Sequence, residues 1–108
     1  MTLNIISIAK DFSLFPGGRL KVSSKCSGEE FREKVLTPAL IAGVPFVVDL
    51  DGVKGYPPSF LEEAFGGLMR NGFTLDQVRS LMTVKSEKQA WVDEVNFCME
   101  NANRLQMT

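Results

Sequence analysis

The residues best suited to do chemistry in this chain surround Ser59. Pro57 and Pro58 come directly before it, and Glu62 follows three residues later. Prolines cannot continue strand pairing, and a serine with a glutamate three residues on forms a capping box, which starts a helix. The Ser59 hydroxyl is therefore expected beside unpaired backbone N–H groups, at the positive end of a helix dipole. Those groups would stabilise a phosphate, so the pattern predicts either a plain helix cap or a phosphorylation site.

The same stretch predicts a surface that binds a partner protein. We expect this surface to comprise the loop before Ser59 and the exposed side of the helix after it. Its residues are Gly55, Tyr56, Pro57, Pro58, Ser59, Glu62, Glu63 and Met69. Glu62 and Glu63 are not expected to act as an acid–base pair, because adjacent residues on a helix point in different directions. We predict that Glu62 completes the cap and that Glu63 faces solvent or the partner.

A second group of residues predicts ligand binding instead. Asp49 and Asp51 end a short apolar run, and strand ends are where α/β proteins place ligand-binding residues. Arg19 ends a Pro-Gly-Gly-Arg run whose backbone N–H groups could hold an anion, although a hairpin turn is the simpler interpretation. No third ligand or phosphate-binding loop accompanies the two aspartates, so no metal or cofactor is expected.

Composition narrows the classes of function. The chain has 108 residues, a net charge of −1, no histidine, and two cysteines at Cys26 and Cys98. This length predicts one domain, 1–108, and the balanced charge gives no strong field for nucleic acid or anionic membranes. Without histidine the chain lacks the commonest general base, so we do not expect an enzyme. Unpaired cysteines and the lack of a membrane-spanning apolar stretch predict a cytoplasmic protein with free thiols.

Strand and helix patterns alternate along the chain. Strands are predicted at 3–8, 19–22, 44–50 and 80–84, and the main helices begin at Ser27, Ser59 and Ser86. The order β-β-α-β-α-β-α predicts an α/β domain with three main helices. Its small four-stranded sheet is expected to be mixed and mostly parallel, starting with an antiparallel hairpin. Helices on both faces of the sheet or chiefly on one are both possible, and the central run, which is apolar at successive positions, favours cover on both faces.

Three details of the helices can be predicted as well. Pro38 is expected to kink or stop the first helix near Thr37. Gly66 and Gly67 are unfavourable inside the second helix, so we expect them to allow its close approach to the sheet. The last helix carries an apolar stripe that should pack in the core. This stripe comprises Trp91, Val95, Cys98, Ala102 and Leu105.

Four runs of residues together suggest a family. They are Pro-Gly-Gly-Arg (16–19), Ser-Gly-Glu-Glu-Phe (27–31), Val-Val-Asp-Leu-Asp-Gly-Val (47–53) and, above all, Pro-Ser-Phe-Leu-Glu-Glu-Ala-Phe-Gly (58–66). On these runs the chain resembles the small bacterial STAS-like domain proteins, which are related to anti-sigma-factor antagonists and to the STAS domain of sulfate transporters. The resemblance implies a small mixed sheet with helices packed on it.

The resemblance also implies a role for Ser59. In anti-sigma-factor antagonists, a serine at the start of the helix after the central strand is phosphorylated by a kinase-like anti-sigma factor, and this switches partner binding off. Ser59 lies at the matching junction, where this chain has Pro-Pro-Ser-Phe (57–60) in place of the usual Asp-Ser-(Ser/Thr)-Gly.

We therefore expect a non-catalytic, cytoplasmic interaction module. Its partner would be a regulatory protein, such as one with a kinase-like ATP-binding domain. Two other interpretations stay open on the sequence alone. One is a nucleotide-binding or small-ligand-binding domain that uses Asp49, Asp51 and Arg19. The other is a structural subunit of a larger complex, which would carry a contiguous exposed apolar patch.

Overall fold

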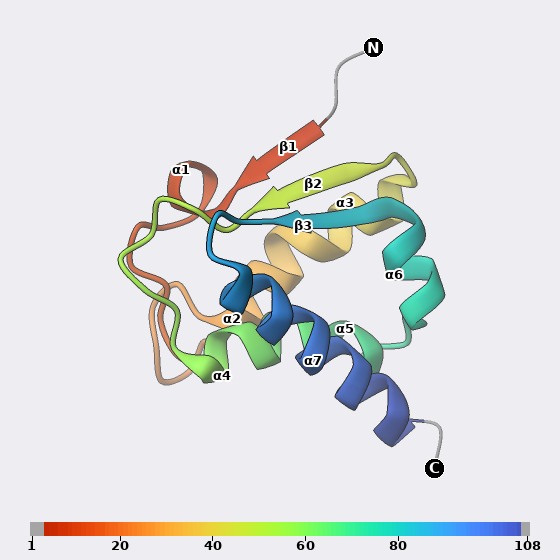
Figure 1. Cartoon of the computed structure of the whole chain (residues 1–108). Coiled ribbons are helices and arrows are strands. Elements are labelled where there is room, and N and C mark those ends of the chain that lie inside the picture. Colours follow the sequence, from red (N-terminus) through yellow and green to blue (C-terminus); the bar gives the residue numbers. More distant parts are fainter. Residues whose placement is uncertain (1–3, 107–108) are drawn as a thin grey trace.

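The computed structural model describes residues 4–106 (Figure 1). Its strands are β1 (Asn4–Ser7), β2 (Phe46–Asp49) and β3 (Met82–Lys85). Its helices are α1 (Ile8–Asp11), α2 (Gly28–Phe31), α3 (Thr37–Ala42), α4 (Pro58–Leu61), α5 (Gly67–Arg70), α6 (Leu75–Leu81) and α7 (Gln89–Gln106). Two π-helical segments, η1 (Arg32–Leu36) and η2 (Glu62–Gly66), join α2 to α3 and α4 to α5. Leu3, where we expected the first strand to begin, lies outside the described residues.

The sheet has three strands in the order β1-β2-β3, and both pairings are parallel. Phe46 in β2 aligns with Asn4 in β1 and with Met82 in β3. The prediction of a parallel α/β sheet is confirmed, but the predicted fourth strand at 19–22 is wrong and the sheet is not mixed.

Residues 19–22 form part of a long loop whose backbone is already used elsewhere. The carbonyl oxygens of Gly18 and Arg19 accept hydrogen bonds from the N–H groups of Gly28 and Glu29. The N–H of Lys21 donates to the Glu29 carboxylate. These groups satisfy the start of α2, so they cannot pair with β1 as a hairpin.

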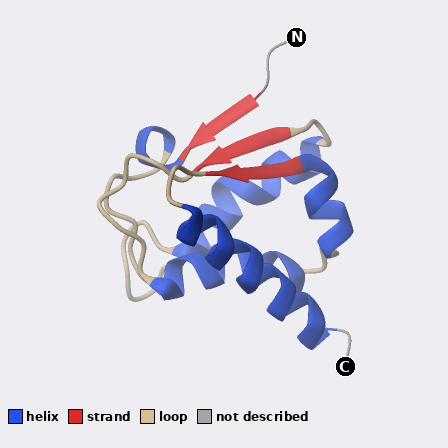
Figure 2. Cartoon of the chain, in the orientation of Figure 1, coloured by secondary structure: helices blue, strands red, loops and turns tan. Residues whose placement is uncertain are grey.

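The main helices gather on one side of the strands, as Figure 2 shows. Consecutive parallel strands joined by right-handed crossovers place both connections on the same face of a sheet. Burial along β2 agrees, because Phe46 and Val48 are buried while Val47 and Asp49 are only half-buried. The expectation of helices on both faces is therefore wrong, and the second face carries the exposed Ile5.

The core lies between the sheet, α7 and the two crossover helices, 28–42 and 58–70. Phe31 from the first lies 5.9 Å from Phe60 and 6.3 Å from Phe65 of the second, measured between ring centroids. All three rings are fully buried, as is Val48 of the central strand. Aromatic rings at these separations add to the apolar area that they bury.

Each crossover contains a continuous helix with a π-helical middle, spanning 28–42 and 58–70. The first helix continues through Pro38, so it does not stop near Thr37, and it ends at Gly43 in the left-handed conformation with φ +73°. The wider π turn η1 ends two residues before Pro38 and includes Lys34, with whose carbonyl group the proline ring would clash in a regular α-helix. The second helix ends at Arg70, with Asn71 as its C-cap and Gly72 following at φ +104°.

Gly66 and Gly67 allow helix 58–70 to approach α7 and the Arg32 side chain closely, whereas we expected them to allow its approach to the sheet. A Cβ at Gly66 would lie 3.2 Å from the Cys98 carbonyl oxygen and 3.4 Å from the Ala102 Cβ, so this glycine lets helix 58–70 pack against α7. A Cβ at Gly67 would overlap the guanidinium of Arg32. The prediction of contact with the sheet is wrong because α7 and the first crossover lie between this part of the helix and the strands.

The last helix begins at Gln89, three residues after Ser86. Its predicted stripe is largely confirmed, since Val95, Cys98 and Ala102 are buried, whereas Leu105 is exposed near the helix end. Within residues 4–106, no helix is long and apolar enough to cross a membrane.

Candidate functional site

The loop between β2 and α4 crosses the edge of the sheet where the strands end. Asp51 holds this loop against the start of α7, because its carboxylate accepts hydrogen bonds from the Ser86 hydroxyl at 2.6 Å and from the Glu87 N–H at 3.0 Å. The Ser86 hydroxyl, followed by the Glu87 N–H, lowers the pKa of the Asp51 carboxyl below its ordinary value. Gly52 follows with φ +95°, a conformation that favours glycine. Asp51 therefore fastens the loop in place.

Tyr56 anchors the other end of this loop. Its hydroxyl donates a 2.6 Å hydrogen bond to the Leu50 carbonyl oxygen, and its ring lies 5.8 Å from Phe60 and 4.8 Å from Trp91. Burial raises the pKa of the Tyr56 hydroxyl above its ordinary value. We expected Tyr56 on the partner-binding surface, but the half-buried ring mainly holds the loop to the two helices beneath it.

Ser59 is the second residue of helix 58–70 and not its cap. Pro58 is the first residue and Pro57 the N-cap, whose carbonyl oxygen accepts from the Phe60 N–H at 3.0 Å. The predicted capping box with Glu62 is wrong, because the fixed φ of Pro58 suits the first helical position and moves the N-cap two residues earlier, from Ser59 to Pro57. Ser59 is partly exposed, and none of residues 4–106 hydrogen-bonds its hydroxyl.

Glu62 and Glu63 lie one turn beyond Ser59 and form a cluster of ion pairs. The Arg19 Nη1 atom lies 2.5 Å from Glu62 Oε1 and 3.1 Å from Glu63 Oε1. Arg70 lies 2.7 Å from Glu62, and Arg32 lies 2.5 Å from Glu63. Hydrogen bonding from Arg70, followed by that from Arg19, lowers the pKa of the Glu62 carboxyl.

This ion-pair cluster corrects the predictions for both glutamates. Glu62 does not cap the helix, and Glu63 faces the protein, with its side chain only 13% exposed. The two adjacent carboxylates do meet at one group, the Arg19 guanidinium. With three arginines around two glutamates, the cluster carries a net charge of +1.

Met69 is only 3% exposed, so its predicted place on the partner-binding surface is wrong. That prediction assumed that one side of this helix faces solvent. Every residue from Ala64 to Met69 is buried instead, because α7 and the first crossover helix both pack against this part of the helix. Met69 therefore lies in the core together with Leu68.

The residues of the alternative ligand site are not brought together. Arg19 belongs to the ion-pair cluster on helix 58–70. Asp49 instead accepts the Asp51 N–H at 2.9 Å and lies 3.9 Å from the Lys85 amine. The part of the chain that the structure describes holds no cluster of three or more cysteine or carboxylate side chains that could bind a metal ion.

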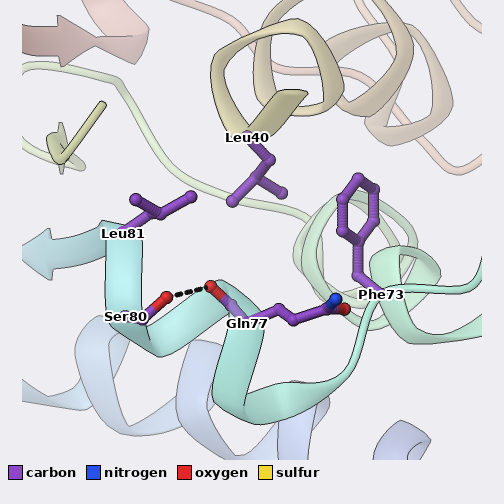
Figure 3. A pocket seen from close by; sticks show the side chains of 5 residues that line it. All are labelled: Leu40, Phe73, Gln77, Ser80 and Leu81. Atoms are coloured by element: carbon purple, nitrogen blue, oxygen red, sulfur yellow. Dashed lines mark hydrogen bonds between the residues drawn. The ribbon is translucent and has the colours of Figure 1, made fainter. Parts of the chain in front are cut away.

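A small hollow lies at the opposite edge of the sheet, where the strands begin. Its lining residues are Leu40, Phe73, Gln77, Ser80 and Leu81, which Figure 3 shows around it. The Ser80 hydroxyl donates to the backbone carbonyl of Gln77 at 2.7 Å, so it does not point a free group into the hollow. The volume of about 180 Å³ is below the range of about 300–1,000 Å³ that is typical of ligand sites.

The arginines of the ion-pair cluster were missed by the sequence analysis. Arg32 had a detectable signal, since it falls three and four residues before Val35 and Leu36 and so on the apolar face of its helix. A buried charge at such a position requires a partner. Arg70 gave no comparable signal. It is eight residues from Glu62 in the sequence, whereas ion pairs that can be recognised from helical spacing are three or four residues apart.

Comparison with known proteins gives one match. The profile of a family described as a STAS-like domain of unknown function (DUF4325) matches residues 27–90. This range includes the first crossover helix, β2, the loop with Ser59, helix 58–70, α6 and β3. No curated protein and no solved structure matches the chain. Because the match covers more than half of the sequence, the chain belongs to this family of STAS-like domains.

Proposed function

We propose that this protein is a non-catalytic regulatory module that binds a partner protein through the surface around Ser59. Phosphorylation of Ser59 would control that binding. The observation that carries the proposal is the Ser59 hydroxyl, which is partly exposed and has no hydrogen-bond partner among residues 4–106. It lies in the first turn of the helix that follows the central strand, the position of the regulatory serine in anti-sigma-factor antagonists.

The charges near Ser59 support a switch. Glu62 and Glu63 lie three and four residues beyond Ser59, and so on the same side of the helix. Arg19, which contacts both, is partly exposed. A phosphate on Ser59 would add a charge of about −2. It would compete with Glu62 for Arg19, which changes both the charge and the contacts of the surface that a partner meets.

The surface itself is smaller than the sequence suggested. Gly55, Pro57, Pro58 and Ser59 retain exposed or partly exposed positions. This stretch is held in one conformation by the contacts of Asp51 and Tyr56 on either side of the loop, which lowers the entropy lost on binding. The free thiols of Cys26 and Cys98 favour a reducing compartment such as the cytoplasm.

A phosphotransfer assay tests this proposal. The purified protein is incubated with Mg-ATP and, one at a time, with proteins that contain a kinase-like ATP-binding domain and come from the same genome. Intact-mass spectrometry detects phosphate, and fragmentation of the peptide locates it. We expect at least one of these proteins to bind the chain and to add a single phosphate at Ser59.

Ser59→Ala and Ser80→Ala are the matched variants. Both serines lie on helices, but the Ser80 hydroxyl is bonded to a backbone carbonyl at the opposite edge of the sheet. The first variant should accept no phosphate and the second should react like the natural protein. Phosphate transfer that persists in Ser59→Ala, or no binding and no transfer with any tested protein, would contradict the proposal.

A further inference from the structure

We infer that the loop at residues 12–27 docks an acidic segment of a partner protein that carries apolar side chains, with Phe15 as the anchor. This inference deepens the proposed interaction function and rests on it, because it names the chemistry of the partner. The loop runs beside the loop that leads to Ser59, as Figure 1 shows, and the Lys54 N–H in that second loop donates to the Leu14 carbonyl oxygen.

Exposed apolar side chains concentrate in this loop. Of the nine exposed large apolar side chains among residues 4–106, four belong to it: Leu14, Phe15, Leu20 and Val22. Phe15 is 67% exposed, although aromatic side chains usually bury their large apolar area. Apolar side chains that gather on a monomer's surface mark interaction sites more often than single exposed residues do.

The loop is nevertheless held in a defined conformation. Gly17 N–H donates to the Cys26 carbonyl oxygen at 2.8 Å, which closes the loop near its base. The Gly18 carbonyl oxygen accepts from Gly28 N–H at 2.8 Å, and the Arg19 side chain ties the loop to helix 58–70. The exposed side chains are therefore presented on a fixed backbone, which reduces the entropy cost of binding a partner.

The charge of the loop at residues 12–27 indicates the chemistry of the partner segment. Residues 12–27 contain three basic and no acidic residues. Arg19 and Lys21 are paired with glutamates of the neighbouring helices. Lys25 in this loop and Lys54 beside it are exposed, and neither has an ion-pair partner in the described part of the chain. Two unpaired lysines next to exposed apolar groups complement a segment that is both acidic and apolar.

A protein partner fits these observations better than an anionic membrane. Stable attraction to anionic lipid requires about four to eight clustered basic residues, whereas this surface offers two unpaired lysines.

Selection from a phage-displayed library of short random peptides tests the inference on the intact protein. We expect the enriched peptides to combine aspartate or glutamate with aromatic or aliphatic residues. The affinity of the best peptide is then measured for Phe15→Ser and for Phe97→Ser. Phe97 is the matched control, since it is 62% exposed but lies on α7. The first variant should bind at least about tenfold more weakly, and the second should bind like the natural protein.

The double variant Lys25→Glu/Lys54→Glu provides an independent readout, and circular dichroism verifies that each variant is folded. The double variant should lose affinity for the acidic peptide, and added salt should no longer weaken the binding, because the two glutamates repel the peptide. The inference is overturned if no acidic, apolar peptide is enriched or if the Phe15 and Phe97 variants bind equally. Phe15-dependent sedimentation with phosphatidylserine vesicles, without peptide binding, would overturn it in favour of a membrane. If Phe15→Ser abolishes peptide binding while Ser59→Asp does not alter it, the result supports docking on the loop at residues 12–27 and contradicts the proposed control of binding by phosphate at Ser59.

Discussion

Replacing Ser59 with alanine tests whether this serine serves the fold or a partner. Its hydroxyl has no hydrogen-bond partner among residues 4–106, so the replacement removes no bond. Alanine is also the better helix former, by about 0.5 kcal/mol. We therefore expect the free energy of unfolding of Ser59→Ala to equal that of the natural protein or to exceed it by up to about 0.5 kcal/mol.

Ser27→Ala is the matched control, because Ser27 does cap its helix. The Ser27 hydroxyl accepts the Glu30 N–H at 3.1 Å and is fully buried. Alanine there leaves the Glu30 N–H without a partner, which should cost about 1–2 kcal/mol. The free energies of unfolding of the two variants should thus differ by at least about 1 kcal/mol, although each variant removes one hydroxyl from the start of a crossover helix.

Urea unfolding, followed by circular dichroism at neutral pH, measures both differences. Equal slopes of the unfolding free energy against urea would show that the compactness of the two states is unchanged. If Ser59→Ala loses as much stability as Ser27→Ala, then the Ser59 hydroxyl makes a structural hydrogen bond in solution, and the reason for assigning it to a partner disappears.

Two further predictions concern the ion-pair cluster. The pKa of Glu62 is lowered by Arg70 and Arg19, so its stabilising effect is complete above the ordinary value of 4.5 and is lost as the pH falls below it. Glu62→Gln should therefore flatten the fall in unfolding free energy seen on acidification, and urea titrations that give parallel pH profiles would refute this. Gly67→Ala should destabilise the protein by about 1–3 kcal/mol through overlap with the Arg32 guanidinium. The same change in an Arg32→Ala background should be neutral or stabilising, and a double-mutant cycle without coupling would show that the overlap is relieved in another way.

Local patterns predicted several helix and strand positions well. Ser27 caps its helix as expected, and Thr74 forms a complete capping box with Gln77, whose three-residue spacing is typical of a helix start. The apolar run at 44–50 contains the central strand β2. These features depend on neighbouring residues, whose spacing alone fixes the hydrogen bonds or the burial.

Features that depend on distant contacts could not be predicted in the same way. The alternating residues at 19–22 suggested a strand, but the backbone of this loop instead satisfies the start of α2. The helical period placed Phe60 and Leu68 correctly inside, but Met69 is buried as well because α7 and the first crossover helix both cover helix 58–70. How many sides of a helix are covered depends on tertiary packing, which the local pattern does not contain.

The sequence predicted the position of the candidate site correctly but several of its contacts wrongly. The strand, loop and helix do meet near Ser59, as the two prolines and the apolar run predicted. The position of the N-cap was wrong by two residues, because Pro58 favours the first helical position more strongly than Ser59 favours the cap. The three arginines were overlooked because they come from three separate segments of the chain.

The most direct test of the central claim is the affinity of the regulatory partner for three forms of the protein. Titration calorimetry should compare the natural protein, Ser59→Ala and Ser59→Asp with the partner found by phosphotransfer. We predict equal affinities for the first two and an affinity at least about tenfold lower for Ser59→Asp, which corresponds to about 1.4 kcal/mol. The same affinity for all three forms would contradict the claim that charge at Ser59 controls binding.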